Sequence, residues 1–185
     1  AIYYFQQAHG LERDAAGILN SLLPLAAMIA TPLFGLWVDK VGRRSLFMIV
    51  GTLILFPLFL IVTYAPPGDL IAVTIPLIGT GKIPLTLLIV MVLLGISFSM
   101  IPAVMWPSVA YIVEQKRLGS GYSLMTLCQQ IGMAAIPWLI GFTNDYFAAS
   151  PENPDGYAPG MWIFTVLASL GLLFSFLLWK TETGP

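Results

Sequence analysis

Charged residues are scarce in this sequence of 185 residues, and their scarcity excludes an ordinary water-soluble domain. Only 9% of the residues are charged, whereas a soluble domain carries about 25% because it must wet its surface. Hydrophobic residues make up 58% of the chain and the mean hydropathy is +0.87. The net charge is −1 and no basic tract occurs, so we expect no nucleic-acid partner. A chain this apolar is expected to have the lipid bilayer around it.

Cysteine and histidine are almost absent, and this excludes most kinds of catalytic and metal site. The chain has one cysteine and one histidine, so no cluster has metal-ligand spacing, and Cys128 in its apolar run forms no disulfide framework. No phosphate-binding glycine loop and no nucleophile-elbow motif occurs. An intramembrane enzyme would need a nucleophile, metal ligands or paired acids at depth. We therefore expect no catalytic residue, no metal, no cofactor and no enzyme.

Long apolar runs are what the sequence does have. Five runs of about 20 to 30 residues match the length of membrane-spanning helices, and they are too long and unbroken for the alternating strands of a barrel. The expected fold is an all-α, polytopic membrane helix bundle in one domain, 1–185. The chain begins within an apolar segment without a methionine, so we expect a fragment with a helix stub at its start. The expected segments are a stub at 1–8 and spans at 15–38, 45–64, 84–113, 118–147 and 160–179.

The segments between the spans differ in character. The turns at 39–44 and 114–117 are charged, and the loop at 148–159 is polar and rich in proline. Residues 65–69 contain two prolines and a glycine, which predicts a break in the chain. Residues 70–80 are apolar but too short to cross a bilayer, so we expect a loop segment that lies on the membrane interface.

The loop charges predict an orientation. One set of alternate loops carries six cations and the opposite set carries two, Arg13 and Lys82. The positive-inside rule places the six-cation side in the cytoplasm. We therefore expect a cytoplasmic C-terminus and outward-facing loops at 65–83 and 148–159. The plasma (inner) membrane is the expected location, and the lysosomal membrane is the alternative. The six cations are Lys40, Arg43, Arg44, Lys116, Arg117 and Lys180.

A charged motif between the first two complete spans is the most specific string in the sequence. Gly42 permits a tight turn with positive φ, and Asp39 can accept hydrogen bonds from a nearby helix N-terminus. Arg43 and Arg44 can pair with carboxylates or anionic headgroups. The alternative is an ordinary charged loop that obeys the positive-inside rule.

Amide and aromatic side chains are the polar groups that stand out at depth, because we find no Asp, Glu, Lys or Arg deep in the spans. Gln129 lies 11 residues into its span, about 17 Å at 1.5 Å per residue, which is near the midplane of the bilayer. Adjacent residues differ by about 100° around a helix, so we expect only one of Gln129 and Gln130 to face a cavity. Asn20 is also deep, and Trp106 precedes the helix-kinking Pro107. The alternatives are an interhelical hydrogen bond for the amides and core packing for Trp106.

The pattern G-x-x-x-D-K-x-G-R-R over residues 35–44 resembles the loop motif of the major facilitator superfamily. The strings at 103–110, 118–122 and 129–132 resemble helices ten and eleven of its lysosomal dipeptide-transporter branch. The resemblance implies the C-terminal six-helix half of a twelve-helix fold, with five complete spans and a stub. The motif residues are Gly35, Asp39, Lys40, Gly42, Arg43 and Arg44.

The resemblance implies secondary transport of a small polar solute, such as a dipeptide, by alternating access. Asp39 would brace the two halves in the outward-open state. Gln129, Gln130, Trp106 and Asn20 would contact the solute together with Tyr4, because the seventh helix of this family lines the cavity. Tyr4 as an interfacial anchor is an equal alternative. The expected partner is an N-terminal half, which would supply the charged groups that hold a dipeptide's termini. The alternative function is a structural or partner-binding membrane subunit that transports nothing.

Overall fold

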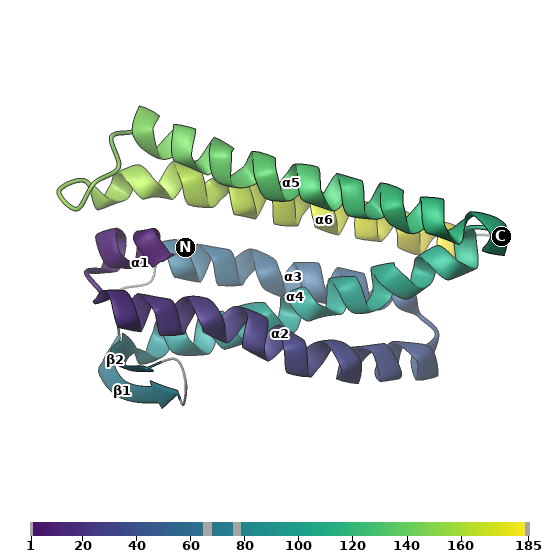
Figure 1. Ribbon diagram of the computed structural model, residues 1–185, viewed down its shortest axis with the longest axis horizontal. Coiled ribbons are helices and arrows are strands. Elements are labelled where there is room, and N and C mark those ends of the chain that lie inside the picture. The colour runs from purple at the N-terminus through teal and green to yellow at the C-terminus, as the bar shows by residue number, and fades with distance from the viewer. Residues whose placement is uncertain (1, 65–67, 76–78, 184–185) are drawn as a thin grey trace.

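The computed structural model describes residues 2–64, 68–75 and 79–183 as a bundle of long helices that lie along one common axis (Figure 1). Five of the described helices are long and apolar enough to cross a membrane, which confirms the expected all-α membrane bundle. Each expected span agrees with one helix to within four residues at either end. The helices are α1 (Ile2–His9), α2 (Arg13–Val41), α3 (Arg44–Tyr64), α4 (Leu85–Ile112), α5 (Leu118–Tyr146) and α6 (Ala158–Thr183).

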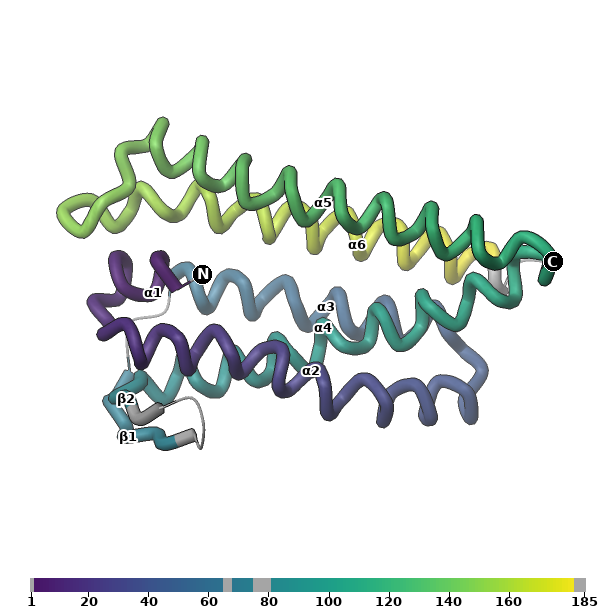
Figure 2. Tube along the Cα trace, viewed as in Figure 1, coloured from purple at the N-terminus to yellow at the C-terminus, as the bar shows by residue number. Residues whose placement is uncertain are grey.

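Helix α4 is the centre of the bundle. It packs against α2 on one side and α3 on the other, α3 packs against α6, and α5 lies along α6 and the end of α4 (Figure 2). The main core lies among α1, α2, α3 and α4 and includes Ile18, Leu19, Leu55, Leu87 and Leu94. By contrast, no residue of α5 is buried. The bundle therefore has a well-packed part and a sparsely covered helix, α5.

Close contacts at glycine hold α4 against its neighbours. A Cβ atom added to Gly95 would meet the carbonyl oxygen of Leu23 and lie 2.8 Å from the Cβ of Ala26, both on α2. Gly51 of α3 has a similar role, since its added Cβ would lie 3.1 Å from the Cβ of Met100. Small residues drive helix association in lipid because they let backbones approach. Gly95 and Gly51 therefore let α2 and α3 approach α4 closely.

Residues 70–80 were expected to form a loop segment, and the structure shows part of a β-hairpin instead. Strand β1 (Leu70–Ile75) pairs antiparallel with β2 (Gly79–Pro84), and Ile71 is opposite Ile83. Pairing satisfies backbone groups that an apolar loop would leave exposed at the bilayer. Ile83 is fully buried in the main core, and Gly81 lies so close to α2 that an added Cβ would be 2.8 Å from the Cα of Ala15. Of the predicted break at 65–69, residues 65–67 lie outside the described residues.

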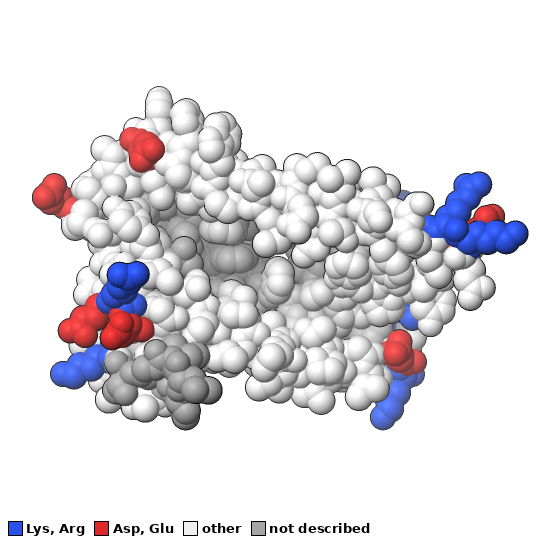
Figure 3. All heavy atoms as spheres, in the orientation of Figure 1, with Lys and Arg blue, Asp and Glu red and all other residues white. Residues whose placement is uncertain are grey.

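Two short 3₁₀ helices complete the described connections. The charged turn after α4 contains η1 (Gln115–Arg117), and the proline-rich loop before α6 contains η2 (Pro154–Tyr157). The charged side chains gather at the two ends of the bundle, and the face shown in Figure 3 carries none between them. This separation is what a bilayer requires, because a charge in the hydrocarbon region is costly unless it is paired or wet.

Replacing Gly95 by valine is expected to destabilise the protein by about 1–3 kcal/mol, because overpacking forces two helices apart. The thermal unfolding of the purified protein in detergent measures this loss. Gly132→Val is the matched control, since Gly132 is also within a helix but has no atom within 4 Å of an added Cβ. Equal loss in the two variants would show that the α2–α4 contact is unimportant.

Candidate functional site

The turn between α2 and α3 carries the charged motif and is shorter than expected. Asp39 and Lys40 belong to the last turn of α2, Arg44 begins α3, and only Gly42 and Arg43 lie between the helices. Gly42 has φ of 71° and donates its N–H to the carbonyl of Val38 at 2.8 Å. This left-handed helix ending confirms the backbone role predicted for Gly42.

Arg44 connects three helices at the end of the bundle that carries the six cations, here called the cationic end. Its Nη2 lies 3.7 Å from Oδ1 of Asp39 on α2. Its guanidinium carbon lies 3.9 Å from the ring centroid of Tyr111, near the end of α4. The Asp39 side chain is 64% exposed, so the ion pair adds little stability and the carboxylate stays accessible to a second partner. The sequence predicted a carboxylate partner for Arg44, but it gave no sign of the contact with the ring of Tyr111.

A second group of candidate residues lies where α4 and α5 meet. The rings of Trp106 and Tyr122 stack with centroids 5.9 Å apart and an interplanar angle of 18°. Trp106 is still 36% exposed, so one face packs on Tyr122 and part of the indole stays accessible. In the sequence, Tyr122 stands out only as the last residue of the string at 118–122 that carries the family resemblance. Its pairing with Trp106 depends on how two helices pack, which spacing along the chain does not reveal.

Helical periodicity separates the two glutamines. Both are exposed on α5. Gln129 follows Tyr122 by seven residues, which is close to two turns, so it lies on the same face of α5 as the ring that contacts α4. Gln130 lies about 100° around the helix from that face. Gln129 is therefore the better candidate to line a path bounded by α4 and α5.

Asn20 and Tyr4 lie farther from this group. Asn20 is exposed on α2, seven residues after the helix begins. The Tyr4 hydroxyl donates a hydrogen bond to the carbonyl of Val62 at 3.1 Å, and its ring meets Tyr157 edge-on at 5.7 Å. Those contacts are at the end of α3 that is opposite the cationic end, whereas Trp106 is six residues from the cationic end of α4. The structure therefore does not bring Tyr4 and Trp106 together.

The surface is hollowed between α5 and α2 on the face shown in Figure 3, which has the orientation of Figure 1. White, uncharged side chains surround the hollow. A solute in such a place would meet apolar and neutral polar groups of this chain, so any ionic contact would have to come from elsewhere.

Comparison with known proteins identifies the family. The family model of the Major Facilitator Superfamily matches residues 1–185. The chain belongs to the major facilitator superfamily. The chain is 29% identical over 144 residues to the lysosomal dipeptide transporter MFSD1 of Bos taurus, which is 77% of this chain and 26% of that protein. It is 28% identical over 145 residues to MFSD1 of Homo sapiens, with 77% and 27% covered. The chain thus spans about a quarter of the length of these curated relatives.

Gly42 should be intolerant of a side chain that Gly35 accepts. Gly42→Ala is expected to cost about 1–2 kcal/mol of stability, because the left-handed conformation places Cβ against the backbone. Gly35→Ala, in the helical part of the same motif, should be neutral or stabilising, since alanine favours helix over glycine. An added Cβ meets no atom within 4 Å at either position, so backbone conformation is the main difference between them. Thermal unfolding compares the two variants, and equal effects would contradict the assignment.

Proposed function

We propose that the protein containing this chain is a secondary transporter that moves a small polar solute by alternating access. The chain would supply the C-terminal six-helix half, with α1 as the end of the seventh helix and α2 to α6 as the next five. The observation that carries the proposal is the family match over residues 1–185 together with five membrane-length helices. The same match favours transport over a structural membrane subunit and over catalysis.

A dipeptide is the proposed solute. The curated relatives bear the name of lysosomal dipeptide transporter, and the amides of Gln129 and Asn20 can hydrogen-bond a peptide group. The exposed part of Trp106 offers an indole N–H and an apolar face. Buried polar contacts fix the orientation of a solute, whereas apolar walls exclude water. The charged groups for the two termini of the dipeptide would come from the N-terminal half.

The charged motif is proposed to control the conformational change. The exposed carboxylate of Asp39 is available to a helix N-terminus of the other half, which favours an anion. Arg44 holds Asp39 near α3, and Gly42 ends α2 so that both side chains emerge at one end. Gly35, Lys40 and Arg43 complete the motif. The rocking of one half against the other would make and break the Asp39 contact.

The proposed topology places the cationic end and the C-terminus in the cytoplasm, because six cations gather there. The membrane in the proposal is the plasma (inner) membrane. The lysosomal location in the relatives' name supports the alternative, a lysosomal membrane.

The two glutamines provide a matched test of the solute path. Gln129→Ala is expected to raise the KM for a labelled neutral dipeptide about 5- to 10-fold, since a lost hydrogen bond costs about 1 kcal/mol. Gln130→Ala, the neighbour on a different face, should change KM less than about twofold. Uptake by the full-length protein in vesicles gives both values, with thermal unfolding as the control for folding. The reverse order of effects would place the path elsewhere, and no uptake by the parent protein would contradict transport.

The topology is tested by single cysteines at opposite ends. In a Cys128→Ala background, Asp69→Cys and Asn153→Cys should react with an impermeant thiol reagent added outside intact cells. Arg117→Cys, at the cationic end, should react only after the membrane is opened. Labelling in the opposite pattern would overturn the orientation, and labelling is read by mass on a denaturing gel.

A further inference from the structure

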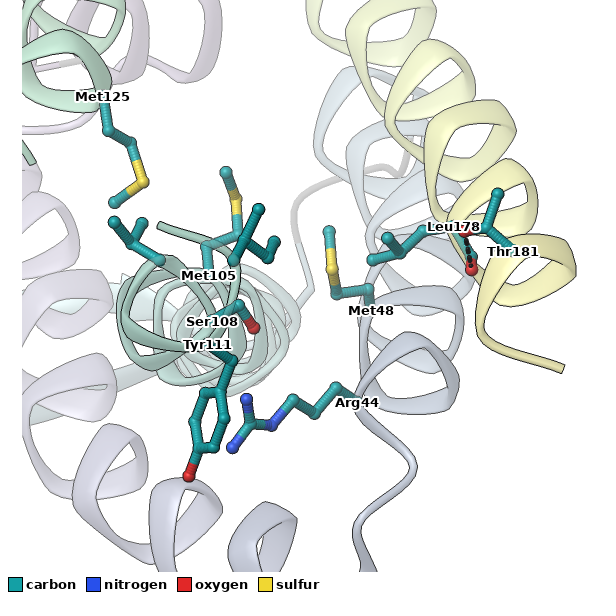
Figure 4. Close-up of a pocket in the computed structure, with 10 residues that line it drawn as sticks. Arg44, Met48, Met105, Ser108, Tyr111, Met125, Leu178 and Thr181 are labelled. Carbon is teal, nitrogen blue, oxygen red and sulfur yellow. Dashed lines mark hydrogen bonds between the residues drawn. The ribbon is translucent and has the colours of Figure 1, made fainter. Parts of the chain in front are cut away.

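A groove of about 480 Å³ opens at the cationic end among α3, α4, α5 and α6 (Figure 4). Its walls are apolar, and methionines come from three of these helices. The unbranched, polarisable methionine side chain adapts to irregular apolar partners. A groove of this size lies within the range of about 300–1,000 Å³ that holds small molecules. The side chains that define it are Arg44, Met48, Met105, Tyr111, Met125 and Leu178.

Arg44 places a positive charge at one end of this groove. Figure 4 shows its guanidinium beside the ring of Tyr111, near the rim, while Met105 and Met125 lie away from it. Met105 precedes Ile112, another lining residue, by seven residues, so the groove runs about 10 Å along α4 at 1.5 Å per residue. It thus extends from the depth of lipid headgroups toward the hydrocarbon.

We propose that this groove binds an acyl chain of an anionic phospholipid and that Arg44 binds the phosphate of the same molecule. The apolar walls match the hydrocarbon chain. The planar guanidinium matches phosphate oxygens in a bidentate geometry. A free anion would leave the apolar part of the groove unfilled, and a lipid without an anionic group would leave the charge of Arg44 unused.

The charge distribution favours an anionic lipid at this end. The sequence places six cations there against three acids, Asp39, Glu114 and Glu182, whereas the other end carries two cations against six acids. Figure 3 shows lysines and arginines of the cationic end projecting beyond the apolar body. Basic residues near the cytoplasmic surface attract anionic lipids, which agrees with the proposed topology.

Asp39 does not prevent this binding. Its Oδ1 is 3.7 Å from the Arg44 Nη2, which is longer than a hydrogen bond, and its side chain is largely exposed. The guanidinium carbon lies over the ring of Tyr111, so this contact is made by the face of the group and not by its N–H edge. A phosphate that approaches this edge can therefore replace Asp39 as a partner of Arg44.

Lipid retention by the purified full-length protein tests the proposal. Native mass spectrometry would measure binding of phosphatidylglycerol and of diacylglycerol, which has acyl chains but no phosphate, at defined concentrations. Arg44→Gln is expected to weaken phosphatidylglycerol binding about tenfold, because it removes a charge-assisted contact, and to leave diacylglycerol unchanged. Met125→Trp, which fills the groove, should weaken both lipids. Arg43→Gln removes an equal charge from the neighbouring exposed residue and should change binding less than twofold.

Several results would overturn the site. Equal losses in Arg44→Gln and Arg43→Gln would mean diffuse attraction to a basic surface. Unchanged binding in Met125→Trp would mean that the groove is not occupied by lipid, and full competition by glycerol phosphate would mean a free-anion site. Arg44→Lys keeps the charge but not the bidentate geometry, so it should retain part of the preference for phosphatidylglycerol. This variant keeps the proposal testable even if Arg44→Gln does not fold. The readout is lipid binding, so its failure leaves the transport proposal untouched.

Discussion

The close approach of α2 and α4 at Gly95 is the contact on which the rest of the bundle depends. In lipid, apolar helices gain little from burying apolar surface against one another, so tight packing of small residues drives association. Gly95 lies against Leu23 and Ala26 of α2, and this contact fixes α2 on one side of α4. Helix α3 packs on the other side of α4, and α6 packs on α3. The hairpin packs on the same pair of helices, since Gly81 lies against Ala15 of α2 and Ile83 lies in the core that includes Leu87 of α4.

Helix α5 is packed less closely than α2, α3 and α4, and this difference is relevant to function. It has no buried residue, yet it carries two amides and several other polar residues. Exposing such residues to the hydrocarbon of the bilayer would cost free energy. Gln129 is exposed and lies on the same face of α5 as Tyr122, whose ring stacks on Trp106 of α4. A helix with sparse packing and a polar stripe fits a wall that is completed by a solute, by water or by another half of the protein.

The sequence predicted features that depend on local chemistry. Hydropathy located the five spans, and glycine at position 42 predicted a left-handed helix ending that the structure confirms. Features that depend on contacts between distant segments were missed. The hairpin was one, because Gly79 and Gly81 carry little strand propensity, and burial of Ile83 in the core compensates. The face of α5 that meets α4 was another, since contacts between the helices, such as the Trp106–Tyr122 stack, are needed to show it.

The two proposed sites share one stretch of α4 and α5. Met105 lines the groove at the cationic end, and Trp106 is the next residue. Met125 also lines the groove, and Gln129 follows it by one helical turn on the same side of α5. An acyl chain in the groove would therefore contact the segment that carries the proposed solute contacts. Because packed helices shift between discrete arrangements rather than deform continuously, a lipid that fills the groove in only one arrangement would favour that arrangement. By this reasoning, membrane composition would affect the transport cycle through α5 even though the lipid and the solute never touch.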